Sequence, residues 1–184
     1  MSQQGLSSIS SSKLADFVNV NHWQIRKDFS YFGDFGKRGV GYNIDTLARQ
    51  IKKILNLDAV HKTVLVGVGN LGSALLAYPG FRIYGFKIAA AFDNDPAKIG
   101  TKVNDVTIED VSKLGTLAKR QANLAIIAVP EQAAQDVADA LVKVGIKGIL
   151  NFVPRRINVP KKIKVITIDI ATDLARLPYY IPSS

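Results

Sequence analysis

Three glycines, Gly67, Gly69 and Gly72, form a G-x-G-x-x-G pattern of the kind that binds a pyrophosphate. They follow apolar β-formers and open a run of Ser, Ala and Leu that favours a helix. In this setting the first glycine allows a tight turn, the second lets a phosphate approach the backbone, and the third lets the helix pack closely. The start of the helix, at Asn70 and Leu71, then faces the phosphates. Glycine turns also occur at ordinary strand–helix corners, so the pattern alone is weak.

An acidic residue follows at the distance expected for a ribose ligand. Asp93 ends the apolar run 86–92 and lies about 20 residues beyond Gly72. A carboxylate there accepts a hydrogen bond from a ribose 2′-hydroxyl and repels a 2′-phosphate, which favours NAD over NADP. Residues 93–96 contain no arginine that would reverse this preference. The alternative interpretation of Asp93 is a cap for the turn that ends the strand.

Further candidate ligands come from apolar runs that predict strands of a parallel sheet, at residues 124–129, 148–152 and 164–168. Open α/β sheets bind ligands at the carboxyl ends of their strands. The residues expected to line that crevice are Val129, Pro130, Asn151 and Asp169, with Tyr78 as its tyrosine. Together with the glycine turn and Asp93, they make up the predicted cofactor-binding set.

For dehydrogenase chemistry the predicted set offers only Tyr78 as a plausible proton donor, and the substrate domain that a dehydrogenase usually appends is missing. Hydride transfer commonly needs a His, Lys or Tyr as proton donor or acceptor. The two histidines, His22 and His61, lie in the N-terminal segment and before the first predicted strand, where a structural role is the simpler interpretation. The chain has no cysteine and no metal-ligand cluster. We therefore expect neither a catalytic nor a metal site.

Composition sets wider bounds. The chain has 184 residues, of which 47% are hydrophobic, enough for a real core. No apolar run approaches the ~18 residues of a membrane span, and the N-terminus lacks the pattern of a secretory signal. Absence of cysteine is compatible with a reducing cytoplasm, where we expect the protein. The net charge of +9 favours a polyanionic partner, although surplus lysine also simply keeps a surface soluble.

The N-terminal residues 1–58 predict a small helical domain. Residues 1–12 are rich in Ser and Gln and predict a flexible tail. A helix is expected over residues 13–18, capped by Ser11 or Ser12, and a second over residues 22–32. Two short helices joined by a tight turn suggest a helix-turn-helix.

The second of these helices has two distinct faces. His22, Ile25, Phe29 and Phe32 fall on one side and predict a core face. The opposite arc carries Trp23, Arg26, Lys27 and Ser30, which suit contacts to phosphates and base edges in a major groove. The alternative is that the two cations only keep a surface helix solvated.

The segment after this helix favours DNA binding. Residues 33–42 alternate glycines and aromatics around Lys37 and Arg38 and predict a β-hairpin, with Gly36 and Gly39 at positive φ. A hairpin in this place is a wing, whose arginine tip can enter a narrow minor groove. A third helix is expected over residues 44–57.

The fold class predicted is α/β: an N-terminal winged-helix DNA-binding domain, then a Rossmann-type dinucleotide-binding domain with a mostly parallel sheet over residues 59–170. Helices are expected over residues 109–117 and 131–144. Residues 171–184 predict a C-terminal helix or tail interrupted by Pro178. Its apolar side chains need a cover, either a partner subunit or its own domain.

Several blocks resemble the Rex family of bacterial redox-sensing transcriptional repressors. They are QIRKDFSYFG at residues 24–33, FGKRGVGY at 35–42, the glycine pattern, YPGF at 78–81, FDNDP at 92–96, GIKGILNF at 145–152, and Asp169. The resemblance implies a homodimer that binds palindromic operator DNA and leaves it when NADH rises relative to NAD⁺. The long first helix of the family has no counterpart in residues 1–12.

By the same resemblance Arg26 and Lys27 belong to the recognition helix, and Arg38 enters the minor groove from the wing. Asp93 would hold the adenosine ribose, and Tyr78 and Asp169 would line the nicotinamide end. The family's last helix typically crosses into the partner subunit. Two alternatives stay open: a small NAD(P)-dependent oxidoreductase or CoA-binding enzyme with an incidental basic N-terminus, and a nucleotide-binding scaffold without DNA binding.

Overall fold

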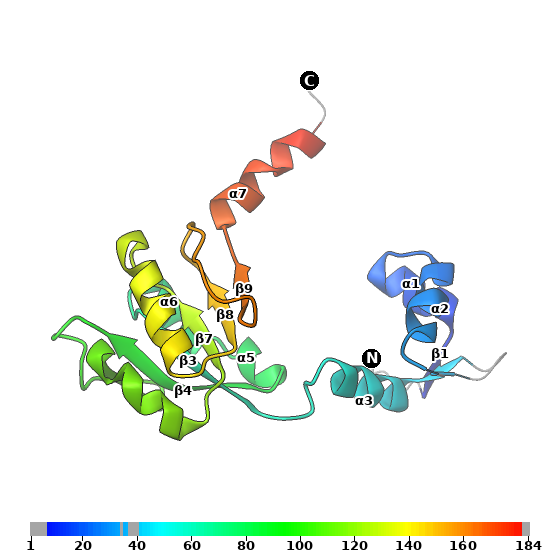
Figure 1. Ribbon diagram of the computed structural model, residues 1–184. Coiled ribbons are helices and arrows are strands. Elements are labelled where there is room, and N and C mark those ends of the chain that lie inside the picture. The colour runs from blue at the N-terminus through cyan, green and yellow to red at the C-terminus, as the bar shows by residue number, and fades with distance from the viewer. Residues whose placement is uncertain (1–6, 34, 37–40, 182–184) are drawn as a thin grey trace. The chain divides into compact units, whose positions relative to one another are not determined.

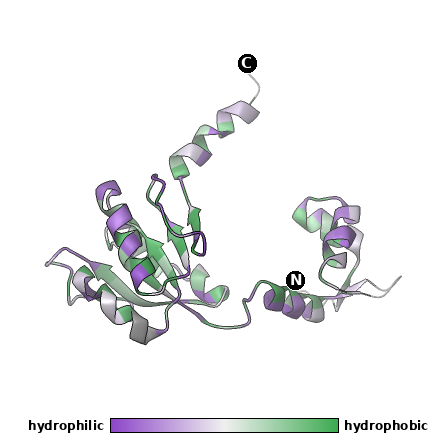
Figure 2. Ribbon diagram, viewed as in Figure 1, coloured by the Kyte–Doolittle hydropathy of each residue, from purple (hydrophilic) through white to green (hydrophobic). Residues whose placement is uncertain are grey.

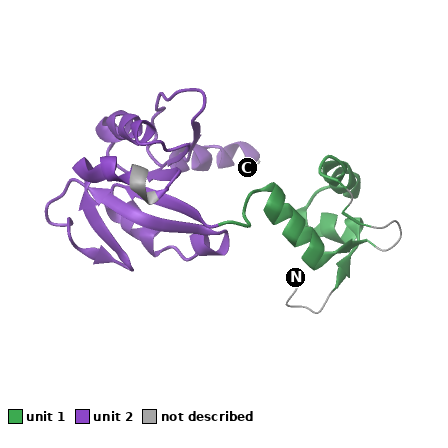
Figure 3. Ribbon diagram, turned by 60° about the horizontal axis from the view of Figure 1, so that its bottom comes forward, with its two compact units in different colours: residues 1–59 green, residues 60–184 purple. Residues whose placement is uncertain are grey.

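A computed structural model of the chain describes residues 7–33, 35–36 and 41–181, with residues 118–120 described by their backbone alone (Figure 1). The chain forms two compact units, Met1–Ala59 and Val60–Ser184 (Figure 3). Unit 1 carries the basic helix predicted from the sequence, and unit 2 carries the glycine turn. No helix within the described ranges combines the length and the apolar character needed to cross a membrane.

Unit 1 is built from short helices that each begin at a polar cap. The helices are α1 (Ser11–Val18), α2 (His22–Ser30) and α3 (Ile44–Ile54). Asn21 Oδ1 accepts a hydrogen bond from the Trp23 backbone N–H at 2.9 Å, and Asn43 Oδ1 accepts one from Thr46 N at 2.9 Å. These caps satisfy backbone donors that a helix leaves unpaired at its start. The buried apolar side chains of the unit are Ile9, Ala15, Ile25, Phe35 and Leu47.

The prediction of a flexible tail over residues 1–12 is wrong from Ser8 onward. Ser8–Ile9 is strand β1, which pairs antiparallel with β2 (Tyr42–Asn43). The Ile9 side chain is only 3% exposed, so its burial fixes the segment. The cap of α1 is Ser10, whose Oγ accepts from Lys13 N at 3.1 Å, rather than Ser11 or Ser12. Isolated apolar residues in a polar stretch gave no periodic signal for this strand.

The hairpin predicted over residues 33–42 lies partly outside the described residues, since Asp34 and residues 37–40, with Lys37, Arg38 and Gly39, are not described. Gly36 does not adopt the positive φ expected of it; Gly33 and Gly41 do, at 120° and 84°. Gly36 is required for another reason. A Cβ there would lie 2.6 Å from the Gly41 carbonyl oxygen, so its backbone passes close to the returning chain.

The core face predicted for α2 is only partly correct. Ile25 is buried, and the Phe29 ring lies 4.9 Å from Phe35 and 5.1 Å from Tyr42 between ring centroids. The helix ends at Ser30, so Phe32 falls beyond it and is 59% exposed. The helix period no longer applies once the backbone has left the helix. Helix α3 likewise ends at Ile54, three residues before the predicted end.

Unit 2 is a seven-stranded sheet in the order β5-β6-β4-β3-β7-β8-β9. All neighbouring strands are parallel except β5 and β6. Its strands are β3 (His61–Val66), β4 (Phe86–Asp93), β5 (Lys102–Val103), β6 (Val106–Asp110), β7 (Leu124–Ile127), β8 (Gly148–Asn151) and β9 (Lys164–Thr167). From β6 to β9 this is the 3-2-1-4-5-6 order of a dinucleotide-binding sheet. The predicted α/β fold class is confirmed.

Helices pack on both faces of this sheet, whose strands are largely hydrophobic (Figure 2). On one face, α6 (Ala134–Lys143) and the 3₁₀ segment η2 (Val111–Arg120) cover the strand residues Val64, Phe92 and Ile127. On the other face, α4 (Asn70–Ala77) and the short α5 (Gly80–Ile83) contribute Leu75, Leu76 and Phe81 to a smaller core with Leu65 and Ile126. A 3₁₀ turn, η3 (Glu131–Ala133), precedes α6.

The helix predicted over residues 109–117 is wrong in its first part. Glu109 belongs to β6, which forms a hairpin with β5 through a turn where Asn104 has φ of 43°. The buried Ile108 holds β6 on the sheet, and alternation over so few residues does not distinguish a strand from a helix start. The chain then continues as the 3₁₀ segment η2.

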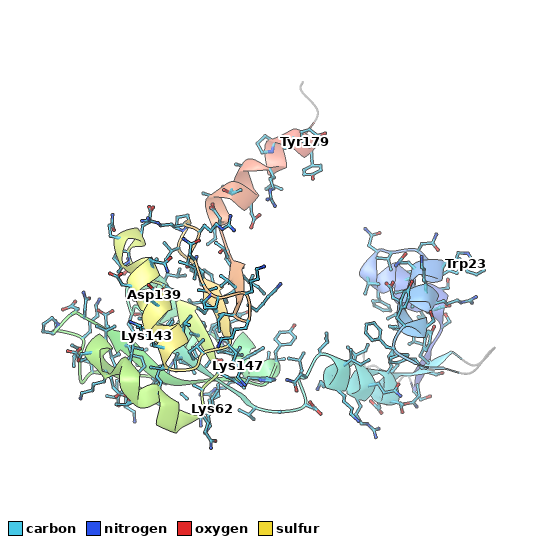
Figure 4. The ribbon with its side chains drawn as sticks, in the orientation of Figure 1. Trp23, Lys62, Asp139, Lys143, Lys147 and Tyr179 are labelled. Carbon is cyan, nitrogen blue, oxygen red and sulfur yellow. The ribbon has the colours of Figure 1, made fainter. Side chains whose placement is uncertain are left out.

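The C-terminal segment forms α7 (Ile170–Ala175) and the 3₁₀ turn η4 (Leu177–Tyr180), which contains Pro178. Its large apolar side chains are exposed: Ile170, Leu174, Leu177, Tyr179, Tyr180 and Ile181. Tyr179 projects from the end of this segment (Figure 4). The predicted apolar tail therefore finds no cover within the described part of its own chain.

Candidate functional site

The glycine turn opens onto a hollow of about 370 Å³ at the carboxyl ends of β3, β4 and β7. This is the place where the strand order of such a sheet reverses and where ligands bind. Five of the predicted cofactor ligands line it: Gly67, Gly69, Asp93, Val129 and Pro130. Residues contributed by three separate strands thus meet around one cavity, as expected from the sequence.

The three glycines of the turn lack a side chain for different geometric reasons. Gly67 has φ of 92°, and a Cβ on it would lie 2.3 Å from the Ala128 carbonyl oxygen. A Cβ on Gly72 would lie 2.0 Å from the Gly67 carbonyl oxygen, so α4 can pack on the turn only without a side chain there. At Gly69 nothing lies within 4 Å of such a Cβ. The space beside Gly69 is therefore open to a ligand.

Asp93 links the glycine turn to the end of β4. Its Oδ2 accepts a hydrogen bond from the Val68 backbone N–H at 2.7 Å, and its Oδ1 accepts one from Asp95 N at 2.9 Å. The Lys98 Nζ lies 3.4 Å from Asp93 Oδ2 and 3.5 Å from Asp95 Oδ2. The bond from Asp95 is the turn cap that was the alternative interpretation of this residue. Asp93 has that role while it also faces the hollow.

The environment of Asp93 favours its ionised form. Burial, with 7% of the residue exposed, opposes ionisation. The backbone N–H groups of Asp95 and Val68 and the Lys98 ammonium outweigh burial and hold the pKa of the Asp93 carboxyl below its usual value. The hollow therefore keeps one fixed acceptor charge beside the glycine turn at neutral pH.

Asp93→Asn is expected to remove stability that depends on pH in a defined way. Because the pKa of Asp93 is lowered by folding, its ionised form stabilises the native state above the unfolded pKa of ~3.9. This contribution disappears as the pH falls through the lower folded value. Urea unfolding should show a wild-type advantage that is constant above about pH 5 and shrinks at lower pH.

Asp105→Asn, which removes one exposed carboxylate from the β5–β6 turn, is the matched control. If the greater stability of the wild type over Asp93→Asn stayed the same at every pH below about 5, the charged role of Asp93 would be contradicted.

The other predicted cofactor ligands lie elsewhere in unit 2. Asn70, Leu71 and Gly72 form the first turn of α4, next to the hollow but outside its lining. Tyr78 lines a second, apolar hollow of about 510 Å³, where its ring meets Phe81 edge-on at 5.3 Å.

Asn151 and Asp169 do not meet at the first hollow. Asn151 is fully buried, and its amide nitrogen donates to the carbonyl oxygens of Val153 at 3.0 Å and Arg155 at 2.9 Å. It fixes the loop after β8. Asp169 caps α7, accepting from Thr172 N at 3.0 Å and Thr172 Oγ1 at 2.7 Å, and these bonds lower the pKa of its carboxyl.

Several residues that line the first hollow were not predicted from the sequence. Lys98 is the most important, because among the described lining residues it alone carries a positive charge, and its ammonium lies beside Asp93. The turn-favouring pair Asp95-Pro96 is the signal that could have located it, because a chain reversal after Asp93 brings Lys98 back toward the carboxylate. The remaining missed lining residues are Val66, Asn94, Asp95, Val111, Ala128, Ala133 and Val137.

In unit 1 the polar face predicted for α2 is solvent-exposed. Trp23 is 65% exposed and projects outward (Figure 4), and Arg26, Lys27 and Ser30 are exposed with it. Arg26 Nε donates to Ser11 Oγ at 3.1 Å, and Ser30 Oγ donates to the Lys27 carbonyl oxygen at 2.7 Å. Neither cation forms an ion pair with another described residue. Both charges remain available to an anionic partner.

Comparison with known proteins identifies relatives of both units. Residues 58–155 match the family model described as "CoA binding domain", and residues 1–30 match "Putative DNA-binding protein N-terminus". The redox-sensing transcriptional repressor Rex of Chloroflexus aurantiacus is 46% identical over 97% of this chain and 85% of its own length. That of Carboxydothermus hydrogenoformans is 47% identical over 97% of this chain and 86% of its own.

Solved structures give the same relationship. RSP in complex with β-NAD⁺ and operator DNA matches 97% of this chain and 82% of the RSP chain, with 35% identity and a TM-score of 0.92. RSP, described as a Rex-family repressor, also matches in its complex with β-NADH, with 33% identity, a TM-score of 0.86 and coverage of 97% and 84%. The chain belongs to the Rex family of redox-sensing transcriptional repressors.

Proposed function

We propose that this protein represses transcription by binding operator DNA through unit 1, and that NADH bound in unit 2 releases it. The observation that carries the proposal is the hollow at Gly69 and Asp93, built for a dinucleotide, in one chain with the exposed basic face of α2. The structures of RSP with β-NAD⁺ and operator DNA, and with β-NADH, support both halves. Operator DNA lies in the cytoplasm, so we place the protein there.

In this proposal the pyrophosphate lies beside Gly69, against the backbone N–H groups of Asn70 and Leu71 at the start of α4. Asp93 accepts hydrogen bonds from the adenosine ribose, and Val129 and Pro130 lie along the cofactor. The family resemblance assigns Tyr78 and Asp169 to the nicotinamide end. When bound, the cofactor supplies a nicotinamide whose charge and shape differ between its two redox forms.

Asp93 also limits which nucleotide fits. Its carboxylate stays ionised and disfavours a phosphorylated ribose, whether the 2′-phosphate of NADP or the 3′-phosphate of coenzyme A. The match of residues 58–155 to a CoA-binding domain keeps a CoA-binding enzyme or a small oxidoreductase as the second candidate. Against an enzyme, the described lining of the first hollow includes no His, its Lys98 lies at the Asp93 end, and Tyr78 lines the separate apolar hollow.

On the DNA side we propose that α2 enters the major groove, where Arg26 and Lys27 contact base edges and phosphates and Ser30 contacts the backbone. Lys37 and Arg38 would extend from the wing into the minor groove. A single such helix covers one half-site. A palindromic operator therefore requires two copies of the chain.

A second copy also accounts for the apolar surfaces of unit 2. The apolar hollow beside Tyr78 is lined by Phe81, Tyr84 and Ile166 among others, and the apolar side chains of residues 170–181 are exposed. We propose that residues 170–181 of each copy cover this hollow in the other, in line with the family's crossing helix. Burial of these two apolar surfaces then stabilises the homodimer.

A chain shortened to end at Asp169 is expected to be monomeric, because it lacks the apolar side chains proposed to cover the partner. Leu174→Asp with Leu177→Asp should do the same, whereas Asp173→Asn, on the same helix, should not. Analytical ultracentrifugation measures the outcome. A shortened chain that remains dimeric would contradict the assignment, and weak operator binding by a monomer would support it.

Release by NADH follows from differential binding. A ligand shifts an equilibrium only as far as its affinities for the two states differ. We propose that NADH prefers the dimer arrangement in which the two α2 helices no longer fit successive half-sites, and that NAD⁺ does not. Reciprocity then requires operator DNA to weaken NADH binding by the same factor.

The experiment is fluorescence anisotropy of labelled operator DNA at one fixed salt concentration, titrated with NADH, NAD⁺, NADPH and coenzyme A. The proposal expects release by NADH, little release by NAD⁺, and weaker effects of the two phosphorylated nucleotides. Equal effects of NADH and NAD⁺ would overturn it. Substrate-dependent change in nicotinamide absorbance would support the oxidoreductase instead.

A further inference from the structure

We propose that Ser11 is a positioning residue that fixes the Arg26 guanidinium end-on to the DNA, and thereby sets base discrimination by α2. The inference rests on the proposed DNA binding of unit 1 and adds a residue outside the recognition helix to it. Ser11 is the first residue of α1, fifteen positions before Arg26 in the chain.

The contact leaves only one end of the guanidinium free. Arg26 Nε donates to Ser11 Oγ at 3.1 Å, and Arg26 Cζ lies 5.4 Å from the centroid of the exposed Trp23 ring. The Trp23 ring in turn lies 5.3 Å from that of His22. Because the Nε–H is bonded to Ser11 and the residue is exposed, the two Nη groups are the fork that remains for an outside partner. Trp23 limits rotation of that fork through contact with its face.

Ser11 is a rigid anchor for this contact. It is 8% exposed, although its neighbours Ser10 and Ser12 are exposed. The Ser10 cap fixes the backbone at the start of α1, and β1, directly before it, is paired with β2. The hydroxyl oxygen therefore has a defined place relative to α2, and packing of α1 against α2 maintains it.

A fixed fork has a specific use on DNA. Two guanidinium N–H groups in one plane match the O6 and N7 acceptors of guanine in the major groove, and phosphate oxygens accept the same fork without sequence preference. When the side chain is already held, little of its rotational freedom is lost on binding. A loose Arg26 would exchange between base and phosphate contacts, and discrimination would fall more than nonspecific binding.

The test is a double-mutant cycle on operator binding. Ser11→Ala should weaken binding by roughly three- to tenfold, the scale of one freed rotamer-rich side chain, and should leave NADH binding unchanged. The loss should disappear in an Arg26→Ala background. Operators with single base-pair changes should show that both variants lose discrimination at the same position. Ser12→Ala, one residue away and exposed, is the matched control, and Ser11→Thr, which restores a hydroxyl, is the rescue.

A measurement without DNA tests the positioning of Arg26 by Ser11 separately from the proposed DNA binding of unit 1. The Nε–H proton of Arg26, observed by NMR in the full chain, should exchange with solvent more slowly in wild type than in Ser11→Ala. If the wild-type chain binds operator but Ser11→Ala weakens the Arg26→Ala variant as much as the wild type, Ser11 acts only through folding and the inference is overturned. Slow exchange in a chain that does not bind operator would overturn the DNA-binding function and, with it, the role of Ser11 in discrimination.

Discussion

Gly69→Val is expected to leave the fold of unit 2 intact and to weaken NADH binding by more than tenfold. Gly69 has φ of −77° and ψ of −160°, extended backbone that a valine also adopts, and nothing lies within 4 Å of an added Cβ. The new side chain would occupy the space beside the turn where a pyrophosphate must approach the backbone. A loss of one phosphate–backbone contact and the steric conflict together exceed ~1.4 kcal/mol, the equivalent of tenfold.

Gly69→Val should also change how the protein responds to NADH when it is bound to DNA. If NADH acts through this hollow, Gly69→Val should remain on operator DNA at NADH concentrations that release the wild type. Isothermal titration with NADH and anisotropy with operator DNA measure the two effects. Normal NADH affinity in a folded Gly69→Val variant would show that the cofactor does not bind at the glycine turn.

Gly72→Ala provides the contrast. Its Cβ would lie 2.0 Å from the Gly67 carbonyl oxygen, so the α4 start and the turn must move apart. This variant should lose thermal stability as well as NADH binding, whereas Gly69→Val should lose chiefly binding. The pair separates a packing glycine from a ligand-facing one within the same motif.

Arg26→Ala is expected to reduce operator affinity by roughly 10- to 100-fold, the range of one good bidentate contact to a base pair. The side chain is exposed on α2, so its removal leaves no buried charge or cavity. NADH binding should be unchanged, because Arg26 belongs to unit 1 and the hollow to unit 2. The loss should be larger for operator than for unrelated DNA.

Arg49→Ala removes another exposed arginine, from α3, and is the charge-matched control. Both variants remove one charge, so a purely electrostatic role would weaken operator and unrelated DNA alike in each. Equal losses for Arg26→Ala and Arg49→Ala would therefore place sequence recognition on a surface other than α2.

The features that could be predicted from the sequence are those set by local chemistry. Glycine spacing, a following acid and apolar runs fix the βα turn and the parallel strands, because each depends on residues close together in the chain. Gly67, Gly69, Asp93, Val129 and Pro130 line one hollow because each lies at or just after the end of such a strand, and the carboxyl ends of parallel strands share one edge of the sheet. The caps Asn21 and Asn43 likewise act within their own turns.

The features that could not be predicted depend on partners distant in sequence. β1 is a strand because it pairs with β2, more than thirty residues later, and two residues carry no period of their own. Asn151, predicted as a cofactor ligand, faces the loop that follows it, and a strand-end position does not specify which way an amide turns. The contact between Ser11 and Arg26 could not be predicted either, because it depends on how α1 packs on α2.

The central claim is that this protein responds to the ratio of NADH to NAD⁺. Operator occupancy should be measured by anisotropy at constant salt and constant total nicotinamide, while the NADH share is raised from none to all. The account predicts that occupancy falls as the NADH share rises, and that Gly69→Val shows no fall. Occupancy that is independent of the NADH share in the wild-type protein would contradict it.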